Sequence, residues 1–375
     1  MMKPNCLISG ALFLAALGAA SSAMAAEKLA LNHVWSRLAD VNGEFGSVES
    51  AEFSVDSTRI VSGTKFDNTV RVFRVSDGAE LWSRTVPQEI ERVGWTADGA
   101  YVASVSEDGL LRVFDAETAE VVFRFQHDNG IDGLTVSHDG RWLATGQERI
   151  DGAGAIRIFS TEDWSLVETL PFRGTVNELD FSSDDGLLAA VGDHMARIYD
   201  TRRWRVKHEF PLASETETYG KGKTYINTRF SPDDALLAVG GTFGFVYIYD
   251  VKQGERVRLI HKSVEKTETV EWTKDGRYLL VAGNGMTIDF FAVEDILDKT
   301  IDNGSLLFAM RVPMTDALEY MHFNETGALL TTAHQDGTVQ LWTFMSDDPT
   351  VNERQHRKVR REQDATARAE GRYVE

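Results

Sequence analysis

The hydrophobic and polar positions of this chain form one phrase that recurs seven times along it. Each unit starts with an apolar segment that ends in a bulky residue and a polar turn, as in Phe53-Ser-Val-Asp56 and Phe230-Ser-Pro-Asp233. A second apolar segment follows, and then an alternating segment that ends in an aromatic residue, as in Val70-Arg-Val-Phe73. The segments are rich in Val, Ile, Leu and aromatic residues and are separated by Asp, Gly, Ser and Asn. This pattern is typical of short β-strands joined by tight turns.

A fourth strand is predicted after the aromatic residue of each unit, for example at Glu80–Val86 and Glu120–Phe125. The aromatic residues that close the seven units lie 40 to 51 residues apart: Phe73, Phe114, Phe159, Tyr199, Tyr249, Phe291 and Trp342. Four strands per unit at this period predict an all-β fold, a seven-bladed β-propeller of four-stranded antiparallel blades.

The last unit has no convincing fourth strand between Trp342 and Pro349. Near the start of the chain, however, His33–Ala39 resembles the fourth strand Glu80–Val86 almost letter for letter. We therefore expect this N-terminal strand to complete the seventh blade and close the ring.

The two ends of the chain lie outside the repeats. Residues 1–25 combine a short basic start, an apolar run from Leu7 to Ala20 and the small residues Ala23 and Ala25. This pattern predicts a cleavable signal peptide and hence a periplasmic or secreted protein, with an uncleaved anchor as the alternative. The propeller is then expected over residues 26–346, followed by a charged tail over 347–375 that is either helical or disordered.

Composition narrows the class of protein further. Hydrophobic residues make up 42% of the 375 residues, which is enough for a large core, and the repeats make that core one ring rather than several domains. The net charge of −19 opposes binding to nucleic acid. A single cysteine excludes an intramolecular disulfide and a cysteine-built zinc site. No stretch is long enough to span a bilayer, so no membrane insertion is predicted.

The units resemble WD40 repeats over roughly residues 30–345, most closely at Ser106–Asp115, Phe230–Asp233 and His334–Trp342. The repeats are degenerate, because Phe-Asp or Tyr-Asp replaces the terminal Trp-Asp and the opening Gly-His pair is missing. The family's His–Ser/Thr–Asp–Trp hydrogen-bond network is therefore expected to be incomplete in every blade. The seventh blade keeps Asp336 and Trp342 but has no obvious histidine partner.

The sequence contains no phosphate-binding loop, nucleophile elbow or HExxH motif, so no cofactor is predicted. One set of polar residues does recur just before the bulky end of each first strand. It includes Glu52, Asp180, Arg229, Glu271 and His322, which this register places near the axis of the ring. Such an axial set is able to bind a metal or act as a lyase-like or lactonase-like site. The favoured interpretation is pairing between blades, such as Arg229 with Glu271, or solvation.

The resemblance implies a non-catalytic scaffold that binds protein partners on one face, where the turns between second and third strands lie. Candidate contact residues from those turns and from the starts of the innermost strands are Phe66, Arg92, Glu107, Glu178, Asn227, Phe243, Tyr320 and Gln335. Phe243 is the best single candidate, because most other blades carry Asp, Asn or Gly there. The loop Ser214–Lys223 and the basic run Arg354–Arg361 are further candidates. The partner's identity and the oligomeric state are left open.

Overall fold

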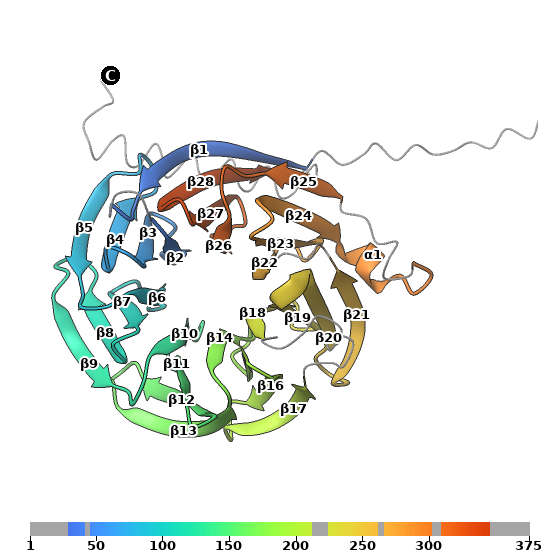
Figure 1. The fold of residues 1–375 in the computed structure, drawn as a ribbon, viewed down its shortest axis with the longest axis horizontal. Helices are drawn as coiled ribbons and strands as arrows, with labels where there is room; N and C mark the ends of the chain where they lie inside the picture. Colours follow the sequence, from blue (N-terminus) through green and yellow to red (C-terminus); the bar gives the residue numbers. More distant parts are fainter. Residues whose placement is uncertain (1–28, 42–45, 212–223, 262–265, 302–308, 346–375) are drawn as a thin grey trace, which may run out of the picture.

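The computed structural model describes residues 29–41, 46–211, 224–261, 266–301 and 309–345. These residues form seven four-stranded antiparallel sheets arranged as blades around a common axis (Figure 1). The predicted seven-bladed β-propeller is therefore confirmed. The signal-like residues 1–25, the tail 347–375 and the loop Ser214–Lys223 lie outside the described residues.

The blades follow one another in chain order, and each runs from an innermost to an outermost strand. The strands of the first three blades are β2 (Val48–Phe53), β3 (Arg59–Thr64), β4 (Thr69–Arg74), β5 (Glu80–Thr85), β6 (Ile90–Trp95), β7 (Tyr101–Ser106), β8 (Leu110–Asp115), β9 (Val121–Gln126), β10 (Ile131–Val136), β11 (Trp142–Ile150), β12 (Ala153–Ser160) and β13 (Leu166–Arg173).

The remaining blades repeat the same plan. Their strands are β14 (Val176–Phe181), β15 (Leu187–Gly192), β16 (Met195–Asp200), β17 (Arg205–Pro211), β18 (Tyr225–Phe230), β19 (Leu236–Gly241), β20 (Phe245–Asp250), β21 (Glu255–His261), β22 (Thr267–Trp272), β23 (Tyr278–Gly283), β24 (Thr287–Ala292), β25 (Met310–Pro313), β26 (Leu318–Phe323), β27 (Leu329–His334), β28 (Thr338–Met345) and β1 (Ala30–Leu38).

Helix is almost absent from the described residues, where it amounts to the short α1 (Val293–Leu297) and the 3₁₀ turn η2 (Thr242–Gly244). Among the described residues, no helix has both the length and the apolar character that a membrane crossing requires.

The seventh blade is closed by the N-terminal strand, as predicted. Strand β1 pairs antiparallel with β28, for example His33 with Trp342, and lies on the outside of that blade (Figure 1). Two side chains of β1 also reach the first blade. Trp35 Nε1 donates to the Val75 carbonyl at 2.8 Å, and Arg37 Nε donates to the Gly78 carbonyl at 2.9 Å. Strand β1 thus closes the ring. It precedes β2 of the first blade in the chain, and it is hydrogen-bonded to β28 of the seventh blade.

The recurring turn after each innermost strand has a local cause. In the first blade, Ser54 Oγ donates to Asp56 Oδ1 at 2.6 Å and accepts from the Arg59 backbone N–H at 3.0 Å. The same hydroxyl-to-carboxylate bond recurs at Thr96, Ser137, Ser182, Ser231 and Thr273. A Ser or Thr followed two residues later by Asp therefore stabilises the turn in six blades.

The hydrophobic core consists of seven clusters, and each one fills the space between two neighbouring blades. The bulky residue at the end of an innermost strand anchors such a cluster. Two of these residues are tryptophans whose indole N–H groups reach the preceding blade: Trp95 donates to the Glu52 carbonyl at 3.2 Å and Trp272 to the Arg229 carbonyl at 3.1 Å. No blade buries its own faces alone, so each depends on its neighbours.

Candidate functional site

Every innermost strand contains a bulge near its start. In the first blade, Val48 pairs with Thr64 and Ser50 pairs with Gly63, so that Glu49 is skipped. The corresponding residue is skipped in all seven blades: Glu49, Glu91, Asp132, Asn177, Ile226, Glu268 and Glu319. A bulge re-aims the side chain of the extra residue, and it does so here at the same level of each blade.

All seven skipped residues line one cavity of about 570 Å³, which we call the upper cavity. The ends of the second strands and the loops between blades also line it, which defines the upper face of the ring. Five of the seven residues are acidic, and we call them the carboxylate crown: Glu49, Glu91, Asp132, Glu268 and Glu319.

The crown is a site of concentrated negative charge. Burial is the main reason that the pKa of Glu49, Glu91 and Glu268 is raised to about 7 in each case. The neighbouring carboxylate of Glu319 further raises the pKa of Glu49 and Glu268. Burial, followed by the charge of Glu91, also raises the pKa of Asp132 well above its usual range. The pKa values of these carboxylates are therefore raised both by their mutual repulsion and by their removal from water.

Further acidic residues surround the crown on one side. The carboxylate oxygens of Glu89, Glu91 and Glu107 lie within 4.8 Å of one another, as do those of Glu107, Asp132 and Glu148. Oxygen ligands of this kind suit ammonium groups and hard divalent cations. Cations of the protein occupy only part of the rim: Lys266 Nζ lies 2.7 Å from Glu268 Oε2, and Lys65 Nζ lies 3.2 Å from Glu89 Oε2.

Below the upper cavity, six side chains from five blades meet at the axis. Arg92 Nε and Asn227 Nδ2 both donate to Glu178 Oε2, at 3.1 and 2.9 Å. The Tyr320 hydroxyl donates to Glu52 Oε1 at 2.8 Å and accepts from Arg229 Nη2. We call this group the axial plug; its members are Glu52, Arg92, Glu178, Asn227, Arg229 and Tyr320.

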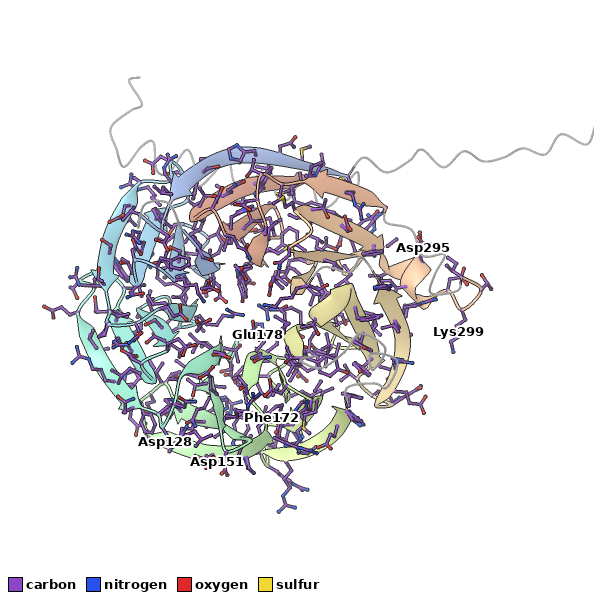
Figure 2. All side chains as sticks on the ribbon, viewed as in Figure 1. Asp128, Asp151, Phe172, Glu178, Asp295 and Lys299 are labelled. Atoms are coloured by element: carbon purple, nitrogen blue, oxygen red, sulfur yellow. The ribbon has the colours of Figure 1, made fainter. Side chains whose placement is uncertain are left out.

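The aromatic ring of Tyr320 lies close to both guanidinium groups of the plug. The Cζ atoms of Arg92 and Arg229 lie 5.4 and 5.2 Å from its centroid, distances at which cation–π attraction operates. Figure 2 shows Glu178 at the inner edge of the ring. Arg92 lines the upper cavity, whereas Glu52, Arg229 and Tyr320 line a second cavity on the lower face. The plug therefore separates the two cavities.

The plug changes the interpretation of three predicted contact residues. Glu178, Asn227 and Tyr320 are only 1, 0 and 2% exposed, so a partner is unable to reach them. The prediction placed them at an open face because they start their strands, but residues of opposite blades cover them at the axis. Their role is to hold the blades together.

The other predicted contact residues have different positions. Phe66 is 43% exposed on the turn between β3 and β4, and Gln335 is exposed on the turn between β27 and β28. Glu107 is half-buried beside the crown, and Arg92 reaches both the upper cavity and the plug. Phe243 lies in η2, and its side chain is outside what the structure describes.

The predicted axial residues lie together around the lower cavity, whose volume is about 270 Å³. Glu52, Asp180, Arg229 and His322 line this cavity, and Glu271 Oε2 lies 3.9 Å from Arg229 Nε, as expected for a pair between blades. Among the described residues, the carboxylate groups compact enough to share a metal ion belong to the upper cavity and not to this axial set.

The carboxylate crown is absent from the residues predicted by sequence, although a signal for it exists. An acidic residue recurs four positions before the bulky end of the first strand in five of the seven units. Strict alternation places that position on the same side of the strand as the bulky core residue, so it is not expected at the axis. Because of the bulge, the side chain at this position instead points into the upper cavity.

The blades also contain internal hydrogen-bond networks. In the seventh blade, Trp342 Nε1 donates to Thr332 Oγ1 at 3.0 Å, and His334 Nε2 lies 2.7 Å from the same oxygen. The expectation that this blade lacks a histidine partner is therefore wrong: His334, at the end of β27, supplies it from within the blade. In the third blade, His127 Nε2 lies 3.3 Å from Thr145 Oγ1.

Two other blades build such a network around a buried arginine. Arg71 contacts Asp67 at 2.5 Å and is buried on β4, and Arg112 is bonded to Asp108 and to Ser106 Oγ on β7. Each arginine lies two residues before the closing aromatic of its blade. The network is therefore rebuilt with other residue types, which explains the weak repeat signature.

Comparison with known proteins agrees with this architecture. The family described as "WD domain, G-beta repeat" matches residues 35–74 and 164–200, and the family described as "Anaphase-promoting complex subunit 4 WD40 domain" matches residues 60–139. These matches support a WD40-repeat β-propeller family for the chain. Its matched segments coincide with the second blade, with parts of the first, third and fourth blades, and with the fourth strand of the seventh blade.

Individual WD40 relatives are distant. The U3 small nucleolar RNA-associated protein 15 homolog of Xenopus tropicalis is 26% identical over 227 residues, which cover 59% of this chain and 41% of that protein. WD repeat-containing protein 1 of Rattus norvegicus is 24% identical over 202 residues, covering 52 and 32%. Serine-threonine kinase receptor-associated protein of Mus musculus is 20% identical over 239 residues, covering 62 and 63%. The chain thus spans less than half the length of the first two of these relatives.

These relatives correct the predicted location of the protein. They are eukaryotic proteins, and the Xenopus relative is named for association with a small nucleolar RNA. This points away from the periplasmic or secreted protein that residues 1–25 suggested.

Proposed function

We propose that this WD40 propeller is a non-catalytic protein-interaction scaffold whose upper cavity binds a basic segment of a protein partner. The observation that carries the proposal is the carboxylate crown, which points five acidic side chains into one cavity of about 570 Å³. Relatives named for their association with other molecules support a scaffold role. The sequence family supports it as well, since repeats of this kind are matched along the ring.

The charge of the crown favours a cationic ligand. Buried carboxylates without enough counter-charge are costly, and this cost is visible in the raised pKa values of Glu49, Glu91 and Glu268. A lysine or arginine side chain entering the cavity adds positive charge to that already supplied by Arg92, Arg149 and Lys266. Binding is then stronger than the same contacts at an exposed surface.

The surrounding turns supply a rim for the rest of the partner. Phe66 and Gln335 are exposed on turns of the upper face, Phe66 in the first blade and Gln335 in the neighbouring seventh blade, which β1 completes. A polar rim with single aromatic residues around a charged centre is suited to a peptide segment rather than to a flat protein surface.

The proposal is tested with a fluorescein-labelled octalysine peptide and fluorescence anisotropy, in buffer containing EDTA so that divalent cations do not occupy the crown. Glu49→Gln/Glu268→Gln should weaken binding by about tenfold or more, because two of the five charges are removed. The control Glu120→Gln/Glu162→Gln makes the same charge change at exposed positions far from the cavity and should change the affinity by less than about twofold. Equal losses in both variants would show only general attraction to an acidic protein and would refute the proposal.

A further inference from the structure

The lower cavity differs from the upper one in both size and lining. It holds about 270 Å³ beneath the axial plug, and side chains of Trp95, Leu134 and Leu179 make part of its otherwise polar wall apolar. Gly94 opens it further. A Cβ atom at that position would lie 3.5 Å from Glu52 Oε2 and 3.8 Å from Leu134 Cδ2, so the missing side chain leaves room beside the Glu52 carboxylate.

In two carboxylates at this cavity, only one of the two oxygens accepts a hydrogen bond from the protein. Glu52 Oε1 accepts from the Tyr320 hydroxyl, and Asp180 Oδ2 accepts from the Phe230 backbone N–H at 2.7 Å. Among the described residues, no donor is bonded to Glu52 Oε2 or Asp180 Oδ1. Each group is therefore held in place by the neighbouring blade while its other oxygen stays available to a donor from outside.

The charges around the lower cavity do not balance. The carboxylates of Glu52, Asp180 and Glu271 surround one guanidinium group, that of Arg229, which also faces Glu178 at 3.9 Å. His322 adds no charge, because its Nδ1 accepts the Phe53 backbone N–H at 3.4 Å and burial lowers its pKa well below the usual value.

The other charged groups that face this cavity lie at its rim. Lys274 and Glu325 are exposed, and His138 is more than half exposed and bonded to Asp185. Burial is the main reason that the pKa of Glu52 and of Asp180 is raised to about 7. The interior of the cavity thus has more negative than positive charge.

We propose that the lower cavity binds a small organic ammonium ion, which donates to Glu52 Oε2 and Asp180 Oδ1 and packs its alkyl part against Trp95 and Leu134. An ammonium group offers three hydrogen-bond donors and one positive charge. The second oxygen of each carboxylate needs a donor, and the cavity needs positive charge. The apolar part of the wall favours an organic cation over a metal ion, and the plug limits the ligand to a few heavy atoms. This site is independent of the proposed partner site in the upper cavity.

The test uses n-butylammonium chloride with n-butanol as its uncharged counterpart, measured by titration calorimetry at pH 8. Butylammonium should bind at least about tenfold more tightly than butanol, since the charged hydrogen bonds discriminate between them. Asp180→Asn keeps an acceptor for the Phe230 N–H and should weaken butylammonium binding about tenfold. Glu120→Gln, at an exposed outer position, is the matched control and should leave binding unchanged.

A second variant keeps the proposal testable if Asp180→Asn folds poorly. Gly94→Val fills the space beside Glu52 without removing any charge, so it should abolish butylammonium binding. Equal binding of butanol, or binding that survives both Asp180→Asn and Gly94→Val, would overturn the proposal. Loss of binding in Glu49→Gln/Glu268→Gln would place the ammonium ion in the upper cavity and would overturn it too.

Discussion

Tyr320 donates its hydroxyl hydrogen to Glu52 across the boundary between the last and the first blade, with 2.8 Å between the two oxygens. The same hydroxyl accepts from Arg229 of the fifth blade, so one side chain connects three blades at the axis. The ring is thus closed twice, by β1 at its outer edge and by the axial plug at its centre.

The first prediction concerns the plug. Tyr320→Phe removes the hydroxyl but keeps the aromatic ring beside Arg92 and Arg229. It leaves a buried carboxylate and a buried guanidinium each short of one partner, so the free energy of unfolding should fall by about 1–3 kcal/mol. Urea unfolding followed by tryptophan fluorescence measures this change. Tyr101→Phe, for whose hydroxyl the structure records no bond, is the control; equal stability of Tyr320→Phe and the wild type would contradict the role of the plug.

The second prediction concerns the outer closure. Trp35 on β1 is buried and bonded to the first blade, whereas the neighbouring Val34 is exposed. Trp35→Ala should lower the free energy of unfolding by about 3–5 kcal/mol, because it opens a cavity in the cluster between the seventh and first blades. Val34→Ala should have little effect. Thermal unfolding of both variants and the wild type measures the difference. Similar melting temperatures for the two variants would show that β1 does not close the ring.

The third prediction concerns the network in the seventh blade. Thr332→Val keeps the shape of the side chain but removes the oxygen shared by Trp342 Nε1 and His334 Nε2. Two polar groups then lose a partner, and the free energy of unfolding should fall by about 1–3 kcal/mol. Thr343→Val, near the surface of β28, is the matched control for urea unfolding. A neutral Thr332→Val would mean that the network contributes nothing to stability.

The fourth prediction concerns pH. Burial raises the pKa of Glu91 from 4.5 to about 7 in the folded protein, so the folded state holds more protons than the unfolded state between these values. The contribution of Glu91 to stability is therefore favourable below about pH 4.5 and is lost as the pH rises through 7. Glu91→Gln should raise the free energy of unfolding on the order of 1 kcal/mol at pH 8 and have little effect at pH 5.

Thermal unfolding of the wild type and Glu91→Gln across this pH range measures the difference directly. Comparing the two proteins at each pH cancels the opposite effect of buried histidines such as His127 and His322, whose pKa values are lowered mainly by burial. A difference in melting temperature that stays constant from pH 5 to pH 8 would rule out a raised pKa at Glu91.

Much of the fold follows from local signals in the sequence. The Ser54-x-Asp56 type of turn, the period-2 apolar pattern and the closing aromatic residues recur in each unit, so they predict four strands and seven blades correctly. The likeness of the segment at His33 to the fourth strand of the first blade also predicts how the ring closes. These signals are local because turn bonds and strand faces depend on residues only a few positions apart.

The candidate sites depend on contacts that no local pattern contains. Glu49 and its six counterparts face the upper cavity only because a bulge shifts each innermost strand by one residue. Tyr320 lies near Arg92 and Arg229, which are far away in the sequence, only because their blades meet at the axis. The sequence by itself determined the strands, their number and the closure of the ring. The tertiary structure decided which side chains meet at the axis, because strand register and the approach of distant blades set those distances.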